Sequence, residues 1–218
     1  RRSVELPIMA PAYRHGIWTN TALMQTMLLA PEVAHEHFHL ATQLAQKSID
    51  EYFSRNVSII GIGGDFAGNT LLISPAAYRE FIVPELKILS DYIRRCGVWS
   101  VNASDGNLWP VIDDFLIGCG VDGYLEIDHQ AGMDLHALKE RYGSKITLFG
   151  NIDCGTILTF GSKEQIQNHV VACLNAGWGN GGHIFCASNA IASGVPLENY
   201  LVMVNTYRDC FGLPQFKL

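Results

Sequence analysis

Six short apolar runs recur along the chain and constrain its fold more than any other feature. They read ELPIMA, VSIIGIG, VWSVN, VDGYLEI, KITLFGN and GHIFCA, and they are rich in β-branched residues. Apolar runs of this kind, without alternation of polar residues, are typical of parallel strands covered on both faces of a sheet. We therefore predict an α/β fold in which buried parallel strands alternate with helices.

The segments between these runs carry capping residues that mark helix starts. Ser74 followed by Pro75 fits an N-cap and a first-turn proline. Asp134 can cap the helical stretch LHALKERY, and Ser162 with Gln165 fits a capping box ahead of IQNHVVACLNA. The chain thus repeats a unit of strand, loop and helix.

This repeat suits either an open doubly wound sheet or a closed (β/α)8 barrel. Polar residues follow nearly every predicted strand, and they are Asp65, Asn102, Asp105, Glu126, Asp128, Asn151, Asp153, Cys186 and Asn189. A barrel places one such set per strand around its C-terminal face. An open sheet would gather them at one crevice instead. The distribution of polar residues favours the barrel.

Composition narrows the range of partners. The chain has 218 residues, 48% hydrophobic and 17% charged, with a net charge of −6 and a pI near 5.7. An acidic surface argues against nucleic acid or an anionic membrane as the main partner, so we expect a small-molecule substrate. No apolar run reaches the roughly 18 residues of a membrane span, and the N-terminal apolar stretch is short for a signal peptide. We predict a cytoplasmic protein.

The cysteines and clustered histidines have ordinary explanations. The six cysteines are scattered without a CxxC motif, so we expect reduced thiols rather than disulfides. His35 and His39 stand four residues apart, as paired metal ligands on a helix can. The segment lacks HExxH and lies away from the predicted strand ends, so we interpret it as a solvated helix face.

Several carboxylates have the position expected of catalytic groups. Asp65 follows the glycine-rich turn GIGGD, where it either caps that turn or points into a pocket. Glu126 and Asp128 directly follow a predicted strand, and carboxylates there can bind a cation or act as a general base. Both interpretations of Asp65 remain open.

Four stretches, in this order, resemble the uroporphyrinogen decarboxylase superfamily, which also contains zinc-dependent, cobalamin-linked methyltransferases. They are GDFAGNTLLISPAAYREFIVPELK, SDGN, GMDLHALKERYGSKITLFGNID and VPLENYL. The resemblance extends from about Pro7 to Gly212. It implies a TIM barrel with its site at the C-terminal ends of the strands. It also implies that residues 1–218 form a single partial barrel domain with about the last six βα units, the first two lying outside the numbered chain.

The sequence differs from the methyltransferases of this superfamily at the positions of their zinc ligands. Aligned on DGN, their first histidine and cysteine positions are Ala103 and Asp105 here, and their last ligand position is Asn189. A methyl group cannot bind a metal, and an amide oxygen is a poor zinc ligand. Cys186 with Asp105 and Glu126 is one substitute set of metal ligands. The alternative, which we favour, is that Cys186 is a buried strand residue.

The resemblance implies an enzyme that moves a methyl group between a small methylated substrate and a corrinoid. Asp65, Asp105 and Glu126 would surround the reacting group, with zinc as a Lewis acid and cobalamin on a partner corrinoid protein. The remaining polar strand-end residues would bind the substrate, and they are Asn102, Asn107, Asp128, Asn151, Asp153 and Asn189. A homodimer is also expected.

Two further functions stay open. One is a metal-independent decarboxylase acting on a tetrapyrrole or a smaller acid, in which Asp105 or Asp65 stabilises a protonated intermediate. The other is a paralogue that binds a ligand and has lost the chemistry. The replacement of metal ligands by Ala103 and Asn189 is what we expect of such a paralogue.

Overall fold

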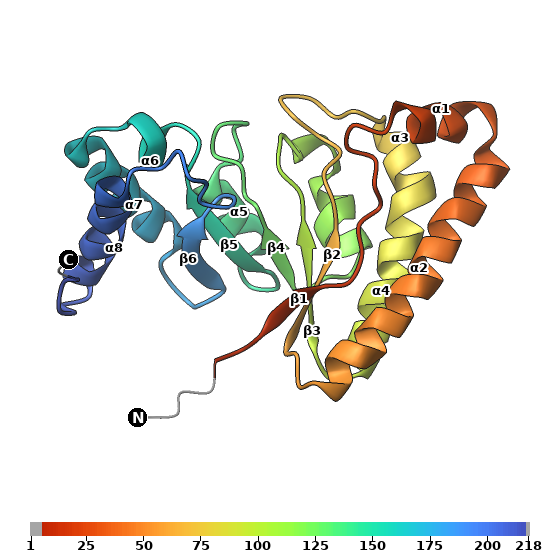
Figure 1. The fold of residues 1–218 in the computed structure, drawn as a ribbon, viewed down its shortest axis with the longest axis horizontal. Helices are drawn as coiled ribbons and strands as arrows, with labels where there is room; N and C mark the ends of the chain where they lie inside the picture. Colours follow the sequence, from red (N-terminus) through yellow and green to blue (C-terminus); the bar gives the residue numbers. More distant parts are fainter. Residues whose placement is uncertain (1–5, 217–218) are drawn as a thin grey trace. The chain divides into compact units, whose positions relative to one another are not determined.

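The computed structural model describes residues 6–216, in which strands alternate with helices (Figure 1). The strands are β1 (Met9–Pro11), β2 (Ile59–Gly63), β3 (Trp99–Ala103), β4 (Gly123–Leu125), β5 (Thr147–Ile152) and β6 (His183–Ala187). The α-helices are α1 (Thr21–Leu29), α2 (Pro31–Ser54), α3 (Pro75–Ala77), α4 (Val83–Arg95), α5 (Leu135–Tyr142), α6 (Ile157–Phe160), α7 (Lys163–Gly177) and α8 (Leu197–Cys210). Short π-helical or 3₁₀ turns occupy Tyr78–Ile82, Trp109–Val111 and Asp114–Gly118.

All six predicted strands are present, and they form a sheet in chain order from β1 to β6. Strand β1 pairs with β2, β2 with β3, and β5 with β6, each in parallel. A parallel sheet in which neighbours in sequence are neighbours in space needs a crossover between each pair of strands. Helices provide most of these crossovers, so the predicted α/β class is confirmed.

The chain divides into two compact units, one up to Tyr124 and the other from Leu125 onward. The division falls within β4. The single partial-barrel domain remains a prediction from the resemblance. Each unit has its own buried apolar residues, and each is described below by itself.

In the first unit, α2 and α4 run alongside each other and α4 packs on β2 and β3 (Figure 1). The buried residues of α2 recur at helical spacing, and they are Ala34, Phe38, Thr42, Ala45 and Ile49. This places one face of the helix in the core. His35 and His39 are exposed on α2. Nε2 of His35 lies 3.5 Å from a carboxylate oxygen of Glu80, and Nδ1 of His39 lies 3.6 Å from one of Glu85. The predicted solvated histidine face is therefore confirmed.

In the second unit, α5 and α7 pack against β5, and α8 packs against α7. Ile166, Val170 and Cys173 form the buried face of α7. The predicted caps are present: Asp134 accepts the N–H of Ala137 at 3.1 Å, and Ser162 accepts that of Gln165 at 3.2 Å.

The capping box of α7 gives a direct test of local stability. Changing Ser162 to Ala removes the acceptor for the Gln165 N–H, so we expect a loss of about 1 kcal/mol in the free energy of unfolding. Urea unfolding followed by far-ultraviolet circular dichroism measures it. Ser144→Ala, at an exposed turn in the same unit, is the control and should change stability by less than about 0.5 kcal/mol. Equal losses in both variants would contradict the role of the cap.

Two of the predictions from composition can be compared with the structure. All six cysteines are free, as predicted, and Cys119 and Cys173 are buried. Among the described residues, no helix combines the length and apolar character needed to cross a bilayer.

Candidate active site

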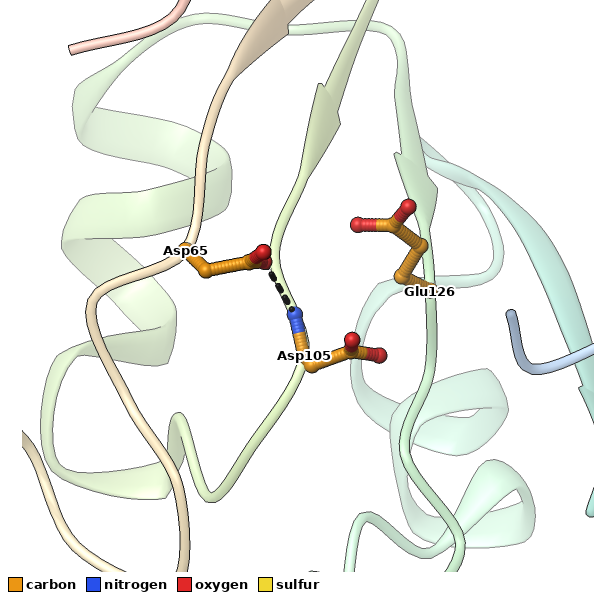
Figure 2. Close-up of side chains that lie close together, drawn as sticks. All are labelled: Asp65, Asp105 and Glu126. Carbon is orange, nitrogen blue, oxygen red and sulfur yellow. Dashed lines mark hydrogen bonds between the residues drawn. The ribbon is translucent and has the colours of Figure 1, made fainter. Parts of the chain in front are cut away.

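Asp65 and Asp105 emerge side by side because their strands are paired in register. Gly63 at the end of β2 is opposite Ala103 at the end of β3, and each aspartate lies two residues beyond its strand. The backbone N–H of Asp105 donates to Oδ1 of Asp65 at 3.0 Å (Figure 2). Their carboxylate oxygens lie within 4.8 Å of one another. The predicted proximity of these two residues is confirmed.

The loops that carry the two aspartates are tied together by their backbones. The Gly64 N–H donates to the Ala103 carbonyl at 2.9 Å, and the Asn107 N–H donates to the Gly68 carbonyl at 2.8 Å. Gly106, with φ of +89°, lies against the backbone of Ala67 and Gly68 so closely that a Cβ would have no room. The turn SDGN is therefore a docked loop, which fixes Asp105 relative to Asp65.

The pair of carboxylates sets the local electrostatics. Both aspartates are half-buried, so each is partly shielded from water while one face remains accessible. Two carboxylates this close attract a cationic group. Asp65 accepts the backbone N–H of Asp105 in the turn after the neighbouring strand, which fixes one of its oxygens. Its predicted role in a pocket stays a prediction.

Asn102 and Asn107 have structural contacts in the same unit. Asn102 is fully buried in β3, and its side-chain amide donates to the carbonyl of Phe115 at 3.0 Å. A substrate at the strand ends does not reach a fully buried side chain, so its predicted role in substrate binding is not supported. Asn107 accepts the N–H of Trp109 at 3.2 Å, which makes it a turn residue that is still half-exposed.

In the second unit, Glu126 and Asp128 directly follow β4. Glu126 is half-buried with φ of +73°. Oδ1 of Asp128 accepts the N–H of Ala131 at 3.1 Å and so caps the turn that leads to α5. Because Glu126 belongs to the second unit, its place beside Asp65 and Asp105 remains a prediction, as does its role as a base.

Asn151 and Asp153 organise the loop after β5. Asn151 is buried, and its amide donates to the Met133 carbonyl at 3.3 Å. Asp153 is buried and accepts the N–H groups of Thr156 at 3.0 Å and Ile157 at 3.2 Å. It also accepts the side-chain amide of Gln130.

The hydrogen bonds of Asp153 determine its charge state. Burial alone would raise the pKa of Asp153, but the donated bonds of Thr156, Gln130 and Ile157 outweigh burial and hold it below the ordinary value of 3.8. Its carboxylate is therefore engaged in holding a loop. The predicted contact of Asn151 and Asp153 with substrate stays a prediction, and the structure gives both residues positioning contacts.

Cys186 and Asn189 lie at the end of β6. Burial, with a smaller effect of Cys173, raises the pKa of the Cys186 thiol to about 11, so it is a protonated, half-buried strand residue. Asn189 is exposed, and its side-chain oxygen accepts the N–H of Ala190 at 2.5 Å.

These residues do not fit the zinc site that the resemblance implies. Ala103 has no ligand atom, and Asn189 offers only an amide oxygen that already accepts a local N–H, so neither position holds a cysteine or a histidine. Of the three residues that align with zinc ligands, Ala103, Asp105 and Asn189, Asp105 alone has a charged oxygen. The donor set argues against thiolate-bound zinc in this chain.

Sequence reasoning missed one histidine of the first unit. His15 is buried. Its backbone N–H donates to the Gly63 carbonyl at 2.9 Å, and its ring meets that of Phe66 edge to face with centroids 5.8 Å apart. Burial lowers the pKa of His15 to about 4, so it stays neutral near pH 7. It holds the segment before α1 onto the end of β2. A lone histidine in a loop gives no pattern from which this could be predicted.

Comparisons with known proteins agree with this geometry. The family model described as uroporphyrinogen decarboxylase (URO-D) matches residues 12–210. A uroporphyrinogen decarboxylase 2, chloroplastic, of Oryza sativa subsp. japonica is 29% identical over 136 residues, which cover 58% of this chain and 31% of that protein. A uroporphyrinogen decarboxylase of Trichodesmium erythraeum is 23% identical over 198 residues, covering 88% of this chain and 52% of that protein.

A solved structure supports the fold independently. A methyltransferase from Methanosarcina mazei superposes with a TM-score of 0.79 at 19% identity, covering 96% of this chain and 60% of that one. The chain thus spans between about a third and three-fifths of these proteins. The predicted fold, part of a barrel of this family built from alternating strands and helices, is confirmed. Because the family model matches most of its length, the chain belongs to the uroporphyrinogen decarboxylase family.

Proposed function

We propose that this chain is part of an enzyme whose reaction is assisted by the carboxylates of Asp65 and Asp105, without a thiolate-bound zinc. The observation that carries the proposal is the hydrogen bond from the Asp105 N–H to Asp65, which holds the two carboxylates together at adjacent strand ends. Two fixed negative charges stabilise a positive charge that develops on a substrate, without reorganisation during the reaction.

Decarboxylation of an acid attached to an electron-rich ring fits these groups best. A proton is added to the ring, the bond to the carboxylate breaks, its electron pair neutralises the cationic ring, and carbon dioxide leaves. A second proton then takes the place of the lost group, and the first proton leaves the ring, so that one proton is taken up in total. Of Asp65 and Asp105, the one whose carboxyl group faces the ring would donate the first proton, and the two carboxylates would then stabilise the cationic intermediate. The curated relatives above are named as decarboxylases of uroporphyrinogen, which makes that compound the first substrate to test.

The experiment measures carbon dioxide released from uroporphyrinogen by the chain and its variants. Asp65→Asn and Asp105→Asn keep the side-chain size and remove the charge, so each is expected to lower the rate by about 10²- to 10⁴-fold. Glu36→Gln changes an exposed carboxylate on α2 and should leave the rate unchanged. Carbon dioxide release that survives both aspartate changes would rule out this role for the pair.

Methyl transfer to a corrinoid is the second candidate, because the fold also matches a methyltransferase. The substrate would be a small methylated compound, and a separate corrinoid protein would carry the cobalamin. Metal analysis and a methyl-transfer assay with a corrinoid acceptor test it. Stoichiometric zinc together with transfer would favour this candidate. An absence of both reactions, with intact ligand binding, would indicate the catalytically degenerate paralogue.

A further inference from the structure

A buried polar cluster lies in the first unit, between the segment that follows β1 and the helices α2 and α4. Tyr13 belongs to that segment, Thr42 lies on the buried face of α2, and Glu85 lies in the first turn of α4. Tyr13 is 6% exposed, Thr42 is 1% exposed, and the side chain of Glu85 is 13% exposed. The cluster contains neither Asp65 nor Asp105 and is independent of the proposed reaction.

Three oxygen atoms of this cluster have no hydrogen-bond partner among the residues that the structure describes. They are the hydroxyl oxygens of Tyr13 and Thr42 and Oε2 of Glu85, and each of these atoms is buried. A buried polar atom without a partner costs free energy, and native structures satisfy nearly all such atoms with protein groups or ordered water. Three such atoms in one place therefore point to a partner that they share.

The three groups lie close to one another. Burial raises the pKa of Tyr13, and the charge of Glu85 raises it further. The Thr42 hydroxyl, which lies beside the phenol without hydrogen-bond geometry, has a smaller opposing effect. His39 lies about one turn before Thr42 on α2, and its Nδ1 is 3.6 Å from Oε1 of Glu85. Oε1 thus faces the exposed histidine, and Oε2 is the oxygen of Glu85 that is left to the cluster.

A water molecule matches the donors and acceptors of this cluster. A buried water makes about three hydrogen bonds, one for each of the orphaned oxygens. A carboxylate oxygen accepts a hydrogen bond, whereas each hydroxyl donates one and also accepts. Water can therefore donate to Glu85 and accept from Tyr13 and Thr42. A cation has no lone pair, so it would leave both hydroxyl protons without an acceptor, and an ion such as Ca²⁺ takes roughly six to eight oxygen ligands.

We propose that Tyr13, Thr42 and Glu85 hold one ordered water molecule, which joins the segment after β1 to α2 and α4. Two residues after Tyr13, the backbone N–H of His15 donates to the Gly63 carbonyl at 2.9 Å. The water therefore anchors a segment that docks, directly after the cluster, on the C-terminal end of β2.

Variants that remove one hydroxyl and keep the rest of the side-chain shape test the bridge by the sign of their effect. Thr42→Val and Tyr13→Phe each break a hydrogen bond to the water, so we expect each to raise the unfolding equilibrium constant about 5- to 30-fold in urea titrations. The double variant should raise it by less than the product of the two single effects, because both hydroxyls act through the same water.

Thr26→Val is the matched control. Its hydroxyl donates to the Ala22 carbonyl within α1 at 2.9 Å, so its removal should change the unfolding constant by less than about threefold. Hydroxyls without any partner would give the opposite sign at the cluster, since replacing an unsatisfied buried group by an apolar one stabilises a fold. Greater stability of Thr42→Val or Tyr13→Phe would therefore overturn the proposal, and so would single effects that multiply in the double variant.

A high-resolution crystal structure locates the water directly. We expect an electron-density peak about 2.5–3.0 Å from each of the three oxygens. Crystals soaked in rubidium chloride separate water from a cation, because rubidium gives an anomalous signal at a monovalent-cation site and water gives none. A peak without anomalous signal would support the proposal. An anomalous peak, an absence of density, or direct hydrogen bonds that join the three side chains would each contradict it.

Discussion

Gly106→Ala is expected to destabilise the first unit by about 2–6 kcal/mol, because it combines backbone strain with overpacking. Gly106 has φ of +89°, which non-glycine residues rarely adopt, and an added Cβ would lie 2.6 Å from the backbone of Ala67 and 2.7 Å from the Gly68 carbonyl. Backbone atoms cannot move aside as the end of a flexible side chain can. The loop that carries Asp105 would therefore have to move away from the loop of Ala67 and Gly68.

Urea unfolding measures this effect, and Gly68→Ala is the control. Gly68 lies in the facing loop and has open space around its added Cβ, so alanine there should change stability by less than about 1 kcal/mol. Under the proposed function, carbon dioxide release by Gly106→Ala should fall together with stability, since the loop positions Asp105. Normal stability in Gly106→Ala would show that the two loops are not docked as described.

The fold was predictable because its signals are local. Apolar runs without alternation identified all six strands, and side-chain caps such as Ser162 with Gln165 identified helix starts. Each depends on residues within a few positions of one another. The division of the chain into two units at β4 depends instead on contacts between distant segments, which leave no periodic signal in a sequence.

The site was predictable in its residues but not in their roles. Parallel strands bring their carboxyl ends to one edge, which places Asp65 and Asp105 at the same face, and the family resemblance implied that they surround one reacting group. Asn102 was assigned to substrate by the same rule, yet it is fully buried in β3 and its side-chain amide donates to the Phe115 carbonyl. Whether a polar residue at a strand end faces a substrate or holds a neighbouring loop depends on one or two residues of register.

The loop after β5 gives the second prediction with a large effect. Asp153 accepts hydrogen bonds from the backbones of Thr156 and Ile157 while it is buried. Asp153→Ala leaves both donors without their acceptor, so we expect a loss of about 2–4 kcal/mol in the free energy of unfolding. Asp134→Asn is the control, because asparagine caps a helix about as well as aspartate and should leave the capped α5 unchanged.

The same residue makes stability depend on pH with a defined sign. The pKa of Asp153 is lowered in the folded state, so the folded chain binds fewer protons there than the unfolded chain. Its contribution is complete well above pH 3.8, the ordinary value, and is lost as the pH falls through the folded-state pKa below 3.8. Unfolding of the wild type and Asp153→Asn, followed in urea from neutral to acidic pH, should therefore differ most near neutrality and converge below that value. A difference that stays constant or grows in acid would show that the Asp153 carboxylate is not held ionised by the loop.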